Sequence, residues 1–485
     1  MDQRAGRFHY IGGAWLISAS TDIIAVVNPA TEAVVANATA GCREDTEKAV
    51  AAARAAFELW SQVSLNDRLD LLKRVSAGIS ARASNLAATI TAEMGCPISF
   101  SRAAQIGLPL GDIKATLDVA AQLSDRVIGR SIVQNDPIGV VAAITPWNFP
   151  LHQIMAKIAP ALAAGCTVVL KPSEVTPLDA IILAEIFHDA GVPAGVFNLI
   201  VGGRETGEAL VSNPNIDMIS FTGSTRGGRA VARAAAAGLK KVALELGGKS
   251  ANIILDDADM EKAVPASLGQ AFINSGQVCA ALSRLIVPES RRKEIEALAI
   301  EAAKGWTLGD PMDPATRLGP LASRAQQARV RQAIAGAVAQ GARLLTGGPD
   351  QPAAQPKGAY ITPTILSEVR PDMAIAREET FGPVLSIIGY SDEQEAVRIA
   401  NDSDYGLSGG VWSGNEDRMM AIARRMRTGQ VILNGASLDL AAPFGGVKQS
   451  GIGRENGRYG LEEYFAPKAI THPQAVGSPA EASRK

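Results

Sequence analysis

The sequence predicts an α/β fold with largely parallel sheets, because helical and strand patterns alternate along most of its 485 residues. Short, wholly apolar runs are typical of strands that are buried on both faces, and Ala-rich stretches with helical spacing separate them. A chain of this length rarely folds around one core, so we expect roughly two or three domains.

The first half of the chain contains the clearest elements. Residues 45–60 and 66–94 are expected to form helices, and another helix is expected after Pro150. Strands are expected at 139–144, 166–171, 197–201 and 216–221. Four strands with helices between them predict a doubly wound sheet of the nucleotide-binding type.

A second βα series is expected after Glu245, with strands at 251–255 and 285–287 and a helix between them. Residues 346–358 are rich in Gly, Pro and Gln, which predicts a surface loop. The polar segment from Gln474 is expected to be disordered.

The composition excludes several classes of function. The chain is 47% hydrophobic and 20% charged with a net charge of -2, which gives no reason to expect nucleic acid or an anionic membrane surface as a partner. No apolar run approaches the roughly 18 to 20 residues that span a bilayer, and the N-terminus does not resemble a signal peptide. The spacing of the cysteines argues against a metal site and a disulfide framework, so we expect a cytoplasmic protein.

Three phrases carry groups that suit covalent catalysis. Residues 276–284 (GQVCAALSR) contain Cys279, and residues 244–250 (LELGGKS) contain Glu245. A thiol that attacks carbon and a carboxylate that moves protons are sufficient for catalysis through a thioester. Residues 145–150 (TPWNFP) form a rigid turn that holds Asn148. The alternatives are a buried apolar Cys279, an ion pair between Glu245 and Lys249, and a turn-capping Asn148.

Four other sequence motifs are less specific for a function when each is taken alone. Residues 221–228 (FTGSTRGG) lie between a strand and a helix, where backbone amides favour phosphate. Residues 171–174 (KPSE) end a strand, residues 378–384 (EETFGPV) precede one, and residues 444–455 (FGGVKQSGIGRE) are rich in Gly. A tight turn, a solvated Lys–Glu pair and an acidic helix end are the alternatives for the first three.

These phrases, in this order, resemble those of the NAD(P)-dependent aldehyde dehydrogenase superfamily, from about Phe8 to Ile470. The resemblance implies a variant Rossmann NAD-binding domain (1–118 and 138–246) and an α/β catalytic domain (247–454). It also implies a small β oligomerisation arm and tail (119–137 and 455–485), with the arm's second segment around Tyr464–Thr471. We therefore expect a homodimer or homotetramer.

The resemblance also assigns site residues. Cys279 is the nucleophile, Glu245 activates water, and Asn148 with the Cys279 backbone N–H forms the oxyanion hole. Lys157 and Glu455 fit a proton path, with a surface ion pair as the alternative for each. The expected NAD contacts are Ile144, Thr145, Pro146, Trp147, Lys171, Glu174, Gly203, Gly207, Phe221, Thr222, Gly223, Ser224, Leu246, Glu379 and Phe381. The expected substrate tunnel comprises Phe149, His152, Gln153, Ala156, Ile273, Leu438 and Phe444, and no metal is expected.

The expected reaction is oxidation of an aldehyde to its acid through a thiohemiacetal and a thioester. Glu174 would repel a 2′-phosphate and so favours NAD, while Arg204 keeps NADP possible. Ala156 supplies neither charge nor bulk, which favours a medium or bulky apolar or aromatic aldehyde in an uncharged tunnel. A CoA-acylating enzyme and a non-catalytic protein on the same scaffold are the alternatives.

Overall fold

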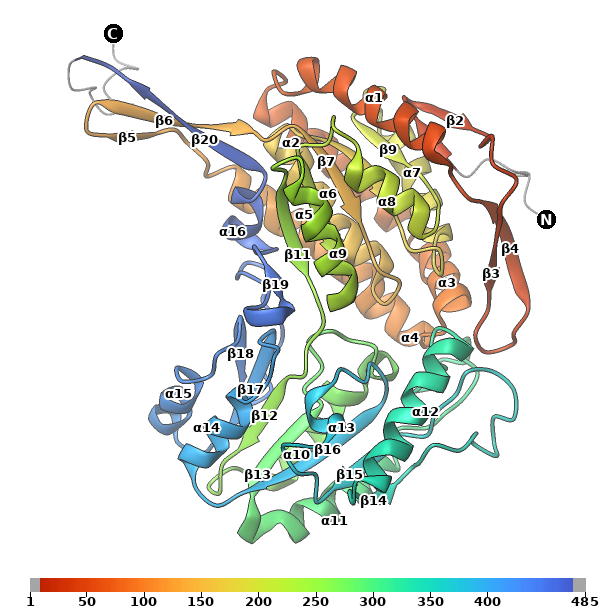
Figure 1. Ribbon diagram of the computed structural model, residues 1–485, viewed down its shortest axis with the longest axis vertical. Coiled ribbons are helices and arrows are strands. Elements are labelled where there is room, and N and C mark those ends of the chain that lie inside the picture. The colour runs from red at the N-terminus through yellow and green to blue at the C-terminus, as the bar shows by residue number, and fades with distance from the viewer. Residues whose placement is uncertain (1–8, 474–485) are drawn as a thin grey trace.

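The computed structural model describes residues 9–473, which form two lobes joined side by side, with a ribbon of strands projecting from one of them (Figure 1). Each lobe is built on one large sheet with helices on both faces. The predicted disorder from Gln474 concerns residues outside the described part of the chain. The expected loop at 346–358 contains no helix or strand after Thr346.

The sheet of the first lobe has eight strands in the described residues, and its middle strands are parallel. In spatial order they are β19 (Gly451–Ile452), β11 (Lys241–Glu245), β10 (Met218–Thr222), β7 (Val140–Ile144), β8 (Thr167–Lys171), β9 (Phe197–Leu199), β1 (His9–Ile11) and β2 (Ala14–Leu16). The four predicted strands are β7 to β10, so this part of the prediction is confirmed.

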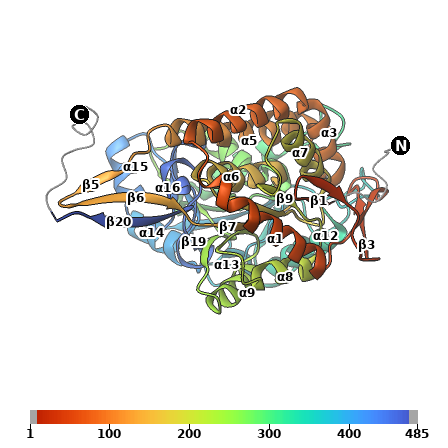
Figure 2. The same cartoon turned by 90° about the horizontal axis from the view of Figure 1, so that it is seen from above.

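Successive residues of these strands enter two different cores, which explains why the strands are apolar throughout. Val141 and Val168 belong to one core, whereas Val140 and Val169 belong to the core on the opposite face. The first face is covered by α2 (Leu65–Ala81), α3 (Ala83–Met94), α5 (Ile106–Ala120), α6 (Pro150–Ala164) and α7 (Leu178–Asp189). The second is covered by α1 (Arg43–Trp60), α8 (Arg204–Ser212) and α9 (Thr225–Ala236) (Figure 2).

The prediction of one helix over 66–94 is wrong, because α2 and α3 are separate helices that meet at Arg82. Arg82 leaves helical geometry, with φ −103° and ψ 13°. Its guanidinium binds the carboxylates of Glu185 at 2.7 Å and Asp189 at 2.5 Å, both on α7. The break therefore has a tertiary cause, since arginine is itself a good helix former.

The second lobe has a seven-stranded sheet in the described residues. In spatial order its strands are β14 (Arg343–Thr346), β15 (Thr364–Ser367), β16 (Val384–Tyr390), β13 (Arg284–Pro288), β12 (Ala251–Ile254), β17 (Ser408–Trp412) and β18 (Gln430–Leu433). Its helices are α10 (Met260–Phe272), α11 (Arg292–Ala303), α12 (Arg324–Ala339), α13 (Ala374–Arg377), α14 (Glu393–Asn401) and α15 (Glu416–Ala423). Ile253 and Ile254 point into opposite cores, as expected for a buried parallel strand.

The projecting ribbon is a three-stranded antiparallel sheet of β5 (Arg126–Ile128), β6 (Ser131–Pro137) and β20 (Phe465–Thr471). These strands coincide with the expected arm. A separate hairpin of β3 (Ile23–Val27) and β4 (Val34–Thr39) extends from the opposite side of the same lobe (Figure 1).

The segment after β18 crosses back to the first lobe earlier than we expected. β19 pairs with β11, although residues up to 454 were assigned to the catalytic domain. The short helix α16 (Gly457–Glu462) packs on α5 and α6, although 455–485 were assigned to the arm and tail. The C-terminal segment therefore closes the first lobe before it enters the arm.

Two absences concern residues 9–473 alone. None of the helices is long and apolar enough to cross a membrane. No cluster of three or more His, Cys, Asp or Glu side chains in this part of the chain could hold a metal ion.

A buried pair of carboxyl groups joins α3 to α7. Glu93 accepts hydrogen bonds from the backbone N–H groups of Leu178 at 3.0 Å and Asp179 at 3.3 Å, at the start of α7. Both Glu93 and Asp179 are fully buried. Burial raises the pKa of Asp179 from its ordinary 3.8 to about 7, and burial and the neighbouring Asp179 raise the pKa of Glu93.

This pair predicts that stability falls between about pH 4 and about pH 7. The folded protein keeps a proton that the unfolded chain releases near pH 3.8, so the free energy of unfolding decreases as pH rises towards 7. Asp179→Asn removes one titrating group and should flatten the dependence of the free energy of unfolding on pH. Each tenfold difference in proton affinity between the folded and unfolded states corresponds to about 1.4 kcal/mol. Unfolding temperatures at pH 5, 7 and 8 measure the slope, with Asp118→Asn on the exposed face of α5 as control. An unchanged slope in Asp179→Asn would contradict the assignment.

Candidate active site

Cys279 follows a backbone turn of unusual geometry. Asn274, Ser275 and Gly276 have φ of 54°, 56° and 71°, so three successive residues are left-handed. Such conformations cost on the order of 1–3 kcal/mol for non-Gly residues and persist only where the surroundings hold them. A side chain at Gly276 would place its Cβ 2.1 Å from the Gly382 carbonyl oxygen, so only glycine fits. The turn fixes where Cys279 lies.

Asn148 is connected directly to this turn. Its Nδ2 donates to the backbone carbonyl of Gln277 at 3.0 Å, two residues before Cys279. In return, Nδ2 of Asn274 donates to the backbone carbonyl of Asn148 at 2.9 Å, and Gln105 Nε2 donates to the same oxygen at 3.0 Å. An amide nitrogen carries two hydrogens, so one remains for an oxyanion at Cys279. The structure brings these two predicted residues together.

Glu245 ends β11 and is 4% exposed. Neither carboxylate oxygen accepts a hydrogen bond from a residue in the described chain. Gly445 leaves room for the side chain, since a Cβ there would lie 2.4 Å from Glu245 Oε1. The alternative ion pair with Lys249 does not form, because neither Glu245 oxygen has a partner, and Lys249 Nζ donates to Thr380 Oγ1 at 3.0 Å instead. Glu245 is thus a buried carboxyl group with free oxygen atoms.

Burial and neighbouring carboxylates oppose ionisation of both reactive groups. Burial, with the charges of Glu245 and Glu379, raises the pKa of the Cys279 thiol to about 12. Burial and the charge of Glu455 raise the pKa of Glu245 well above its usual range. Negative charge on one group therefore disfavours negative charge on the other, so the thiol needs a proton acceptor before it can attack carbon.

Lys157 and Glu455 form a buried ion pair, so the expected alternative of a surface pair is wrong for both. The Lys157 side chain is inaccessible and the Glu455 side chain is 6% exposed. Lys157 Nζ bonds Glu455 Oε1 and also donates to Thr222 Oγ1 at 2.6 Å. Because their charges act on the pKa of Glu245, the pair lies beside the predicted base.

A groove of about 1240 Å³ lies along the carboxyl ends of β7, β8 and β10. The predicted cofactor contacts that line it are Ile144, Thr145, Lys171, Glu174, Gly203, Gly207, Phe221, Thr222 and Ser224. The opposite wall was not predicted from the sequence, and it comprises Ser20, Asp22, Ile24, Gly41, Cys42 and Arg43. No local pattern indicates these residues, because only the fold brings the N-terminal segment to the groove.

The groove suits a dinucleotide. Ser224 caps α9 by accepting from Gly227 N at 3.2 Å, so the helix begins at the groove with its amide groups available to phosphate. A Cβ at Gly223 would lie 2.6 Å from the Phe221 ring, which explains the glycine there. The Glu174 side chain is 51% exposed and lies 3.8 Å from Lys171 Nζ.

The remaining predicted cofactor residues, Pro146, Trp147, Gly223, Leu246, Glu379 and Phe381, do not line this groove. Glu379 lies near Cys279 instead, since its charge acts on the pKa of the thiol. Trp147 and Phe381 meet edge to face at 5.4 Å, and Glu379 Oε1 accepts from Gly248 N at 3.1 Å. A Cβ at Gly248 would lie 2.7 Å from the Cys279 carbonyl oxygen, so the Glu379 region and the thiol are adjacent.

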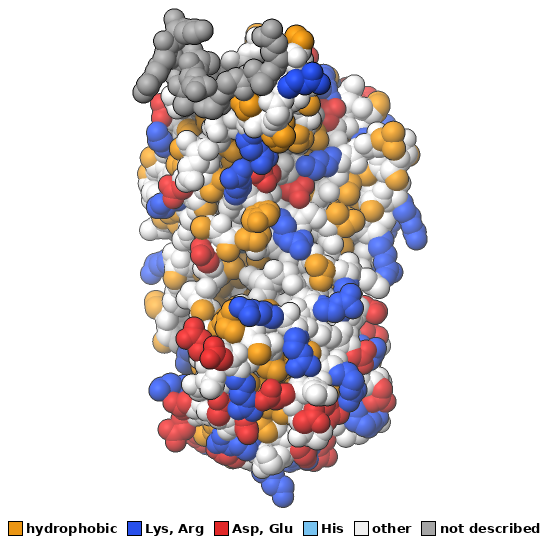
Figure 3. Space-filling model, turned by 90° about the vertical axis from the view of Figure 1, so that its left-hand side faces the viewer, with side chains coloured by type: hydrophobic (Ala, Val, Ile, Leu, Met, Phe, Trp, Pro, Cys, Tyr) orange, Lys and Arg blue, Asp and Glu red, His pale blue; other side chains and the backbone are white. Residues whose placement is uncertain are grey.

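The predicted tunnel residues divide into an interior group and a surface group. Phe149, His152, Gln153 and Ala156 are buried near the start of α6. Ile273 and Leu438 are 39% and 40% exposed, and Phe444 is half-buried. Figure 3 shows the side of the molecule where β18, β19 and α16 lie, with hydrophobic side chains gathered across the middle and charged ones below.

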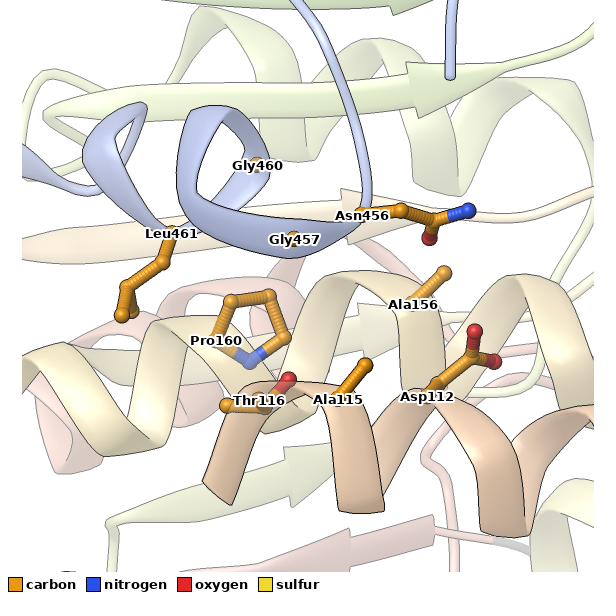
Figure 4. A pocket seen from close by; sticks show the side chains of 9 residues that line it. All are labelled: Asp112, Ala115, Thr116, Ala156, Pro160, Asn456, Gly457, Gly460 and Leu461. Atoms are coloured by element: carbon orange, nitrogen blue, oxygen red, sulfur yellow. The ribbon is translucent and has the colours of Figure 1, made fainter. Parts of the chain in front are cut away.

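Among the predicted tunnel residues, His152 has an acidic partner. Its Nδ1 lies 2.6 Å from Asp112 Oδ2 of α5, and both residues are buried. The Ala156 side chain and the Asp112 carboxylate also border a small cavity beneath α16 (Figure 4). An acidic residue within an otherwise apolar helical face was the available signal for this pair.

The sequence model of the Aldehyde dehydrogenase family matches residues 15–470. The chain belongs to the aldehyde dehydrogenase family. It is 49% identical over 472 residues to a 3-succinoylsemialdehyde-pyridine dehydrogenase of a Pseudomonas species, covering 96% of this chain and 98% of that protein. It is 41% identical over 469 residues to the geranial dehydrogenase of Castellaniella defragrans, with coverage of 95% and 98%.

The similarity extends to solved aldehyde dehydrogenase structures. A cysteine-to-alanine mutant of aldehyde dehydrogenase C from Pseudomonas syringae, complexed with NAD+ and octanal, has a TM-score of 0.97 and 48% identity. That comparison covers 98% of this chain and 99% of the other. The predicted α/β fold and the family are therefore confirmed. This aldehyde dehydrogenase is an oxidoreductase that acts on aldehydes with the cofactor NAD(P).

Proposed function

We propose that this aldehyde dehydrogenase oxidises a medium-sized or bulky apolar or aromatic aldehyde to its carboxylic acid with NAD, through intermediates on Cys279. The observation that carries the mechanism is the convergence of three groups. The Asn148 amide is bonded to the turn before Cys279, and the free carboxyl group of Glu245 affects the pKa of the thiol. A nucleophile, a proton acceptor and an oxyanion donor therefore lie together.

The protein's groups act in two stages. Glu245 accepts the thiol proton, directly or through water, as sulfur bonds to the carbonyl carbon and the carbonyl electrons move to oxygen. The Asn148 amide and the Cys279 backbone N–H stabilise this oxyanion, and losing one such donor costs about 2.7–4 kcal/mol. A bound nicotinamide would supply the acceptor for the hydride that leaves this carbon. Once this first proton has left Glu245, the carboxylate takes a proton from water, which attacks the thioester and releases the acid and the Cys279 thiolate.

Lys157 and Glu455 are proposed to relay the proton away from Glu245. The support is their buried contact and their effect on the Glu245 pKa. Thr222 holds the Lys157 ammonium at 2.6 Å, which orients it beside Glu455.

The enzyme is expected to prefer NAD to NADP, by about tenfold or more in kcat/KM. A 2′-phosphate next to Glu174 would suffer like-charge repulsion, and Arg204 is engaged by Glu208 at 2.7 Å. Glu174→Gln should narrow the ratio, whereas Glu205→Gln, on α8 in the same groove, should leave it near the wild-type value. Steady-state kinetics with both cofactors measures the ratio of the two kcat/KM values, and a preference for NADP would contradict the proposal.

The proposed substrate class rests on Ala156 and on the relatives. The solved relative was complexed with octanal, and the two curated relatives are named for geranial and a pyridine semialdehyde. We expect kcat/KM for octanal or benzaldehyde to exceed that for succinic semialdehyde by about tenfold, since an unpaired carboxylate is costly to bury. NADH formation with the three aldehydes measures this ranking, and the reverse order would contradict it.

The alternative of a CoA-acylating enzyme remains testable in the same assay. Glu245, with free oxygens beside the thiol, favours water as the acyl acceptor. Added CoA should therefore leave the rate unchanged, whereas CoA-dependent turnover would establish the alternative. NAD binding without turnover of any aldehyde would establish a non-catalytic protein.

The oligomer and the compartment are also proposed. The edges of the arm, with Ile128 63% and Ile470 48% exposed, favour pairing with another copy in a homodimer or homotetramer. A reducing cytoplasm would keep Cys279 as a usable thiol.

A further inference from the structure

The Asp112–His152 pair lies close to the position where an aldehyde must bind. His152 follows Asn148 by four residues and lies in the first turn of α6, which begins at Pro150. Its ring meets the Phe149 ring edge to face, at 6.1 Å and 81°. The pair thus continues from the oxyanion amide along the wall that the substrate chain should follow.

The two sides of the pair face different spaces. Asp112 Oδ1 accepts no hydrogen bond from the described residues, and this carboxylate borders a cavity of about 10 Å³. Figure 4 shows the Asp112 carboxylate and the Asn456 amide extending to the same side of Ala156. The cavity is about large enough for one water molecule, and therefore too small for part of a substrate.

His152 faces the other way. Its Nδ1 is held by Asp112, whereas its Nε2 makes no hydrogen bond within the described chain and is not a fully buried atom. The residue keeps 9% of its surface exposed beside Phe149. One ring nitrogen is therefore available to a ligand in a wall that is otherwise apolar.

We propose that His152, oriented by Asp112, donates a hydrogen bond from Nε2 to a neutral oxygen in the substrate chain behind the aldehyde carbon, such as a ketone. The inference rests on the proposed function and narrows its substrate class to apolar aldehydes with a second carbonyl group.

The charges near His152 favour a neutral group over an anion. Those that act on its ring are Asp112 from α5, Lys157 from α6 and Glu455 from the segment before α16. Asp112 with His152 and Lys157 with Glu455 are two internally balanced pairs, which leave no excess positive charge for a carboxylate. Although burial opposes it, the charge and the hydrogen bond of Asp112 raise the pKa of His152 from its ordinary 6.5, which favours the form that donates from both ring nitrogens.

The test compares octanal with 4-oxo-octanal, which has the same chain length, and with succinic semialdehyde. Wild-type kcat/KM should favour 4-oxo-octanal over octanal by about tenfold, as expected for a hydrogen bond from a charged donor. His152→Leu should abolish this ratio, whereas Thr116→Val, on the wall of the small cavity, should keep it. Equal values in the wild type, an unchanged ratio in His152→Leu, or a preference for succinic semialdehyde would overturn the inference.

The pH dependence of the same ratio provides a second readout that does not depend on how well His152→Leu folds. The ratio should fall as pH rises, because neutral His152 keeps its proton on Nδ1 beside Asp112 and cannot donate from Nε2. Asp112→Asn should move this fall to lower pH, and a pH-independent ratio in the wild type would overturn the proposal. Octanal turnover without a preference overturns this inference alone, whereas no NADH from any aldehyde overturns the proposed function as well.

Discussion

Replacing Cys279 with alanine is expected to abolish NADH formation from every aldehyde. The substitution removes the sulfur that forms the bond to the carbonyl carbon. Losing a covalent nucleophile typically lowers kcat by factors on the order of 10⁴ to 10⁶. The change in volume is small and the site is half-buried, so we expect the variant to remain folded.

The matched control is Cys166→Ala, which removes the buried thiol of the residue that precedes β8. Cys166 Sγ donates only to the Tyr464 carbonyl at 3.4 Å, so this variant should lose some stability while its turnover persists. NAD should still raise the unfolding temperature of Cys279→Ala, because the cofactor groove is unchanged. Turnover by Cys279→Ala within tenfold of the wild type would refute the assignment.

The strands and the reactive residues could be predicted because their signals are local. A parallel strand such as β7 is buried on both faces, so its sequence is apolar at every position. Cys279, Glu245 and Asn148 each stand in a phrase that can be read within about ten residues. Their convergence was implied by resemblance, and the structure supplies the hydrogen bond from Asn148 to Gln277 that connects two of them.

The features that were missed depend on contacts between residues distant in sequence. Arg82 breaks a helix because two carboxylates about 100 residues away in the sequence bind it, and the helix propensity of arginine does not predict the break. His152 and Asp112 are 40 residues apart, and Lys157 and Glu455 are 298 apart. In each case the sequence gives the residue type but neither its partner nor its burial. Burial decides whether an ion pair is structural or acts on the chemistry.

Glu245→Gln separates the two halves of the reaction. Glutamine keeps the size of the side chain but cannot accept a proton from water, so hydrolysis of the thioester should slow by about 10² to 10⁴. Hydride transfer precedes hydrolysis, so mixing enzyme, NAD and aldehyde should give a rapid burst of up to one NADH per active site, followed by a slow steady rate.

The burst depends on how Cys279 loses its proton in the variant. Removing the Glu245 charge removes one of the causes that raise the pKa of the thiol, which favours the thiolate and preserves the burst. If Glu245 is also the sole acceptor of the thiol proton, the burst itself will slow in parallel with the steady rate. Stopped-flow absorbance distinguishes the two cases, with Glu462→Gln, in an exposed pair with Arg458 on α16, as control. A wild-type steady rate in Glu245→Gln would show that another group activates water.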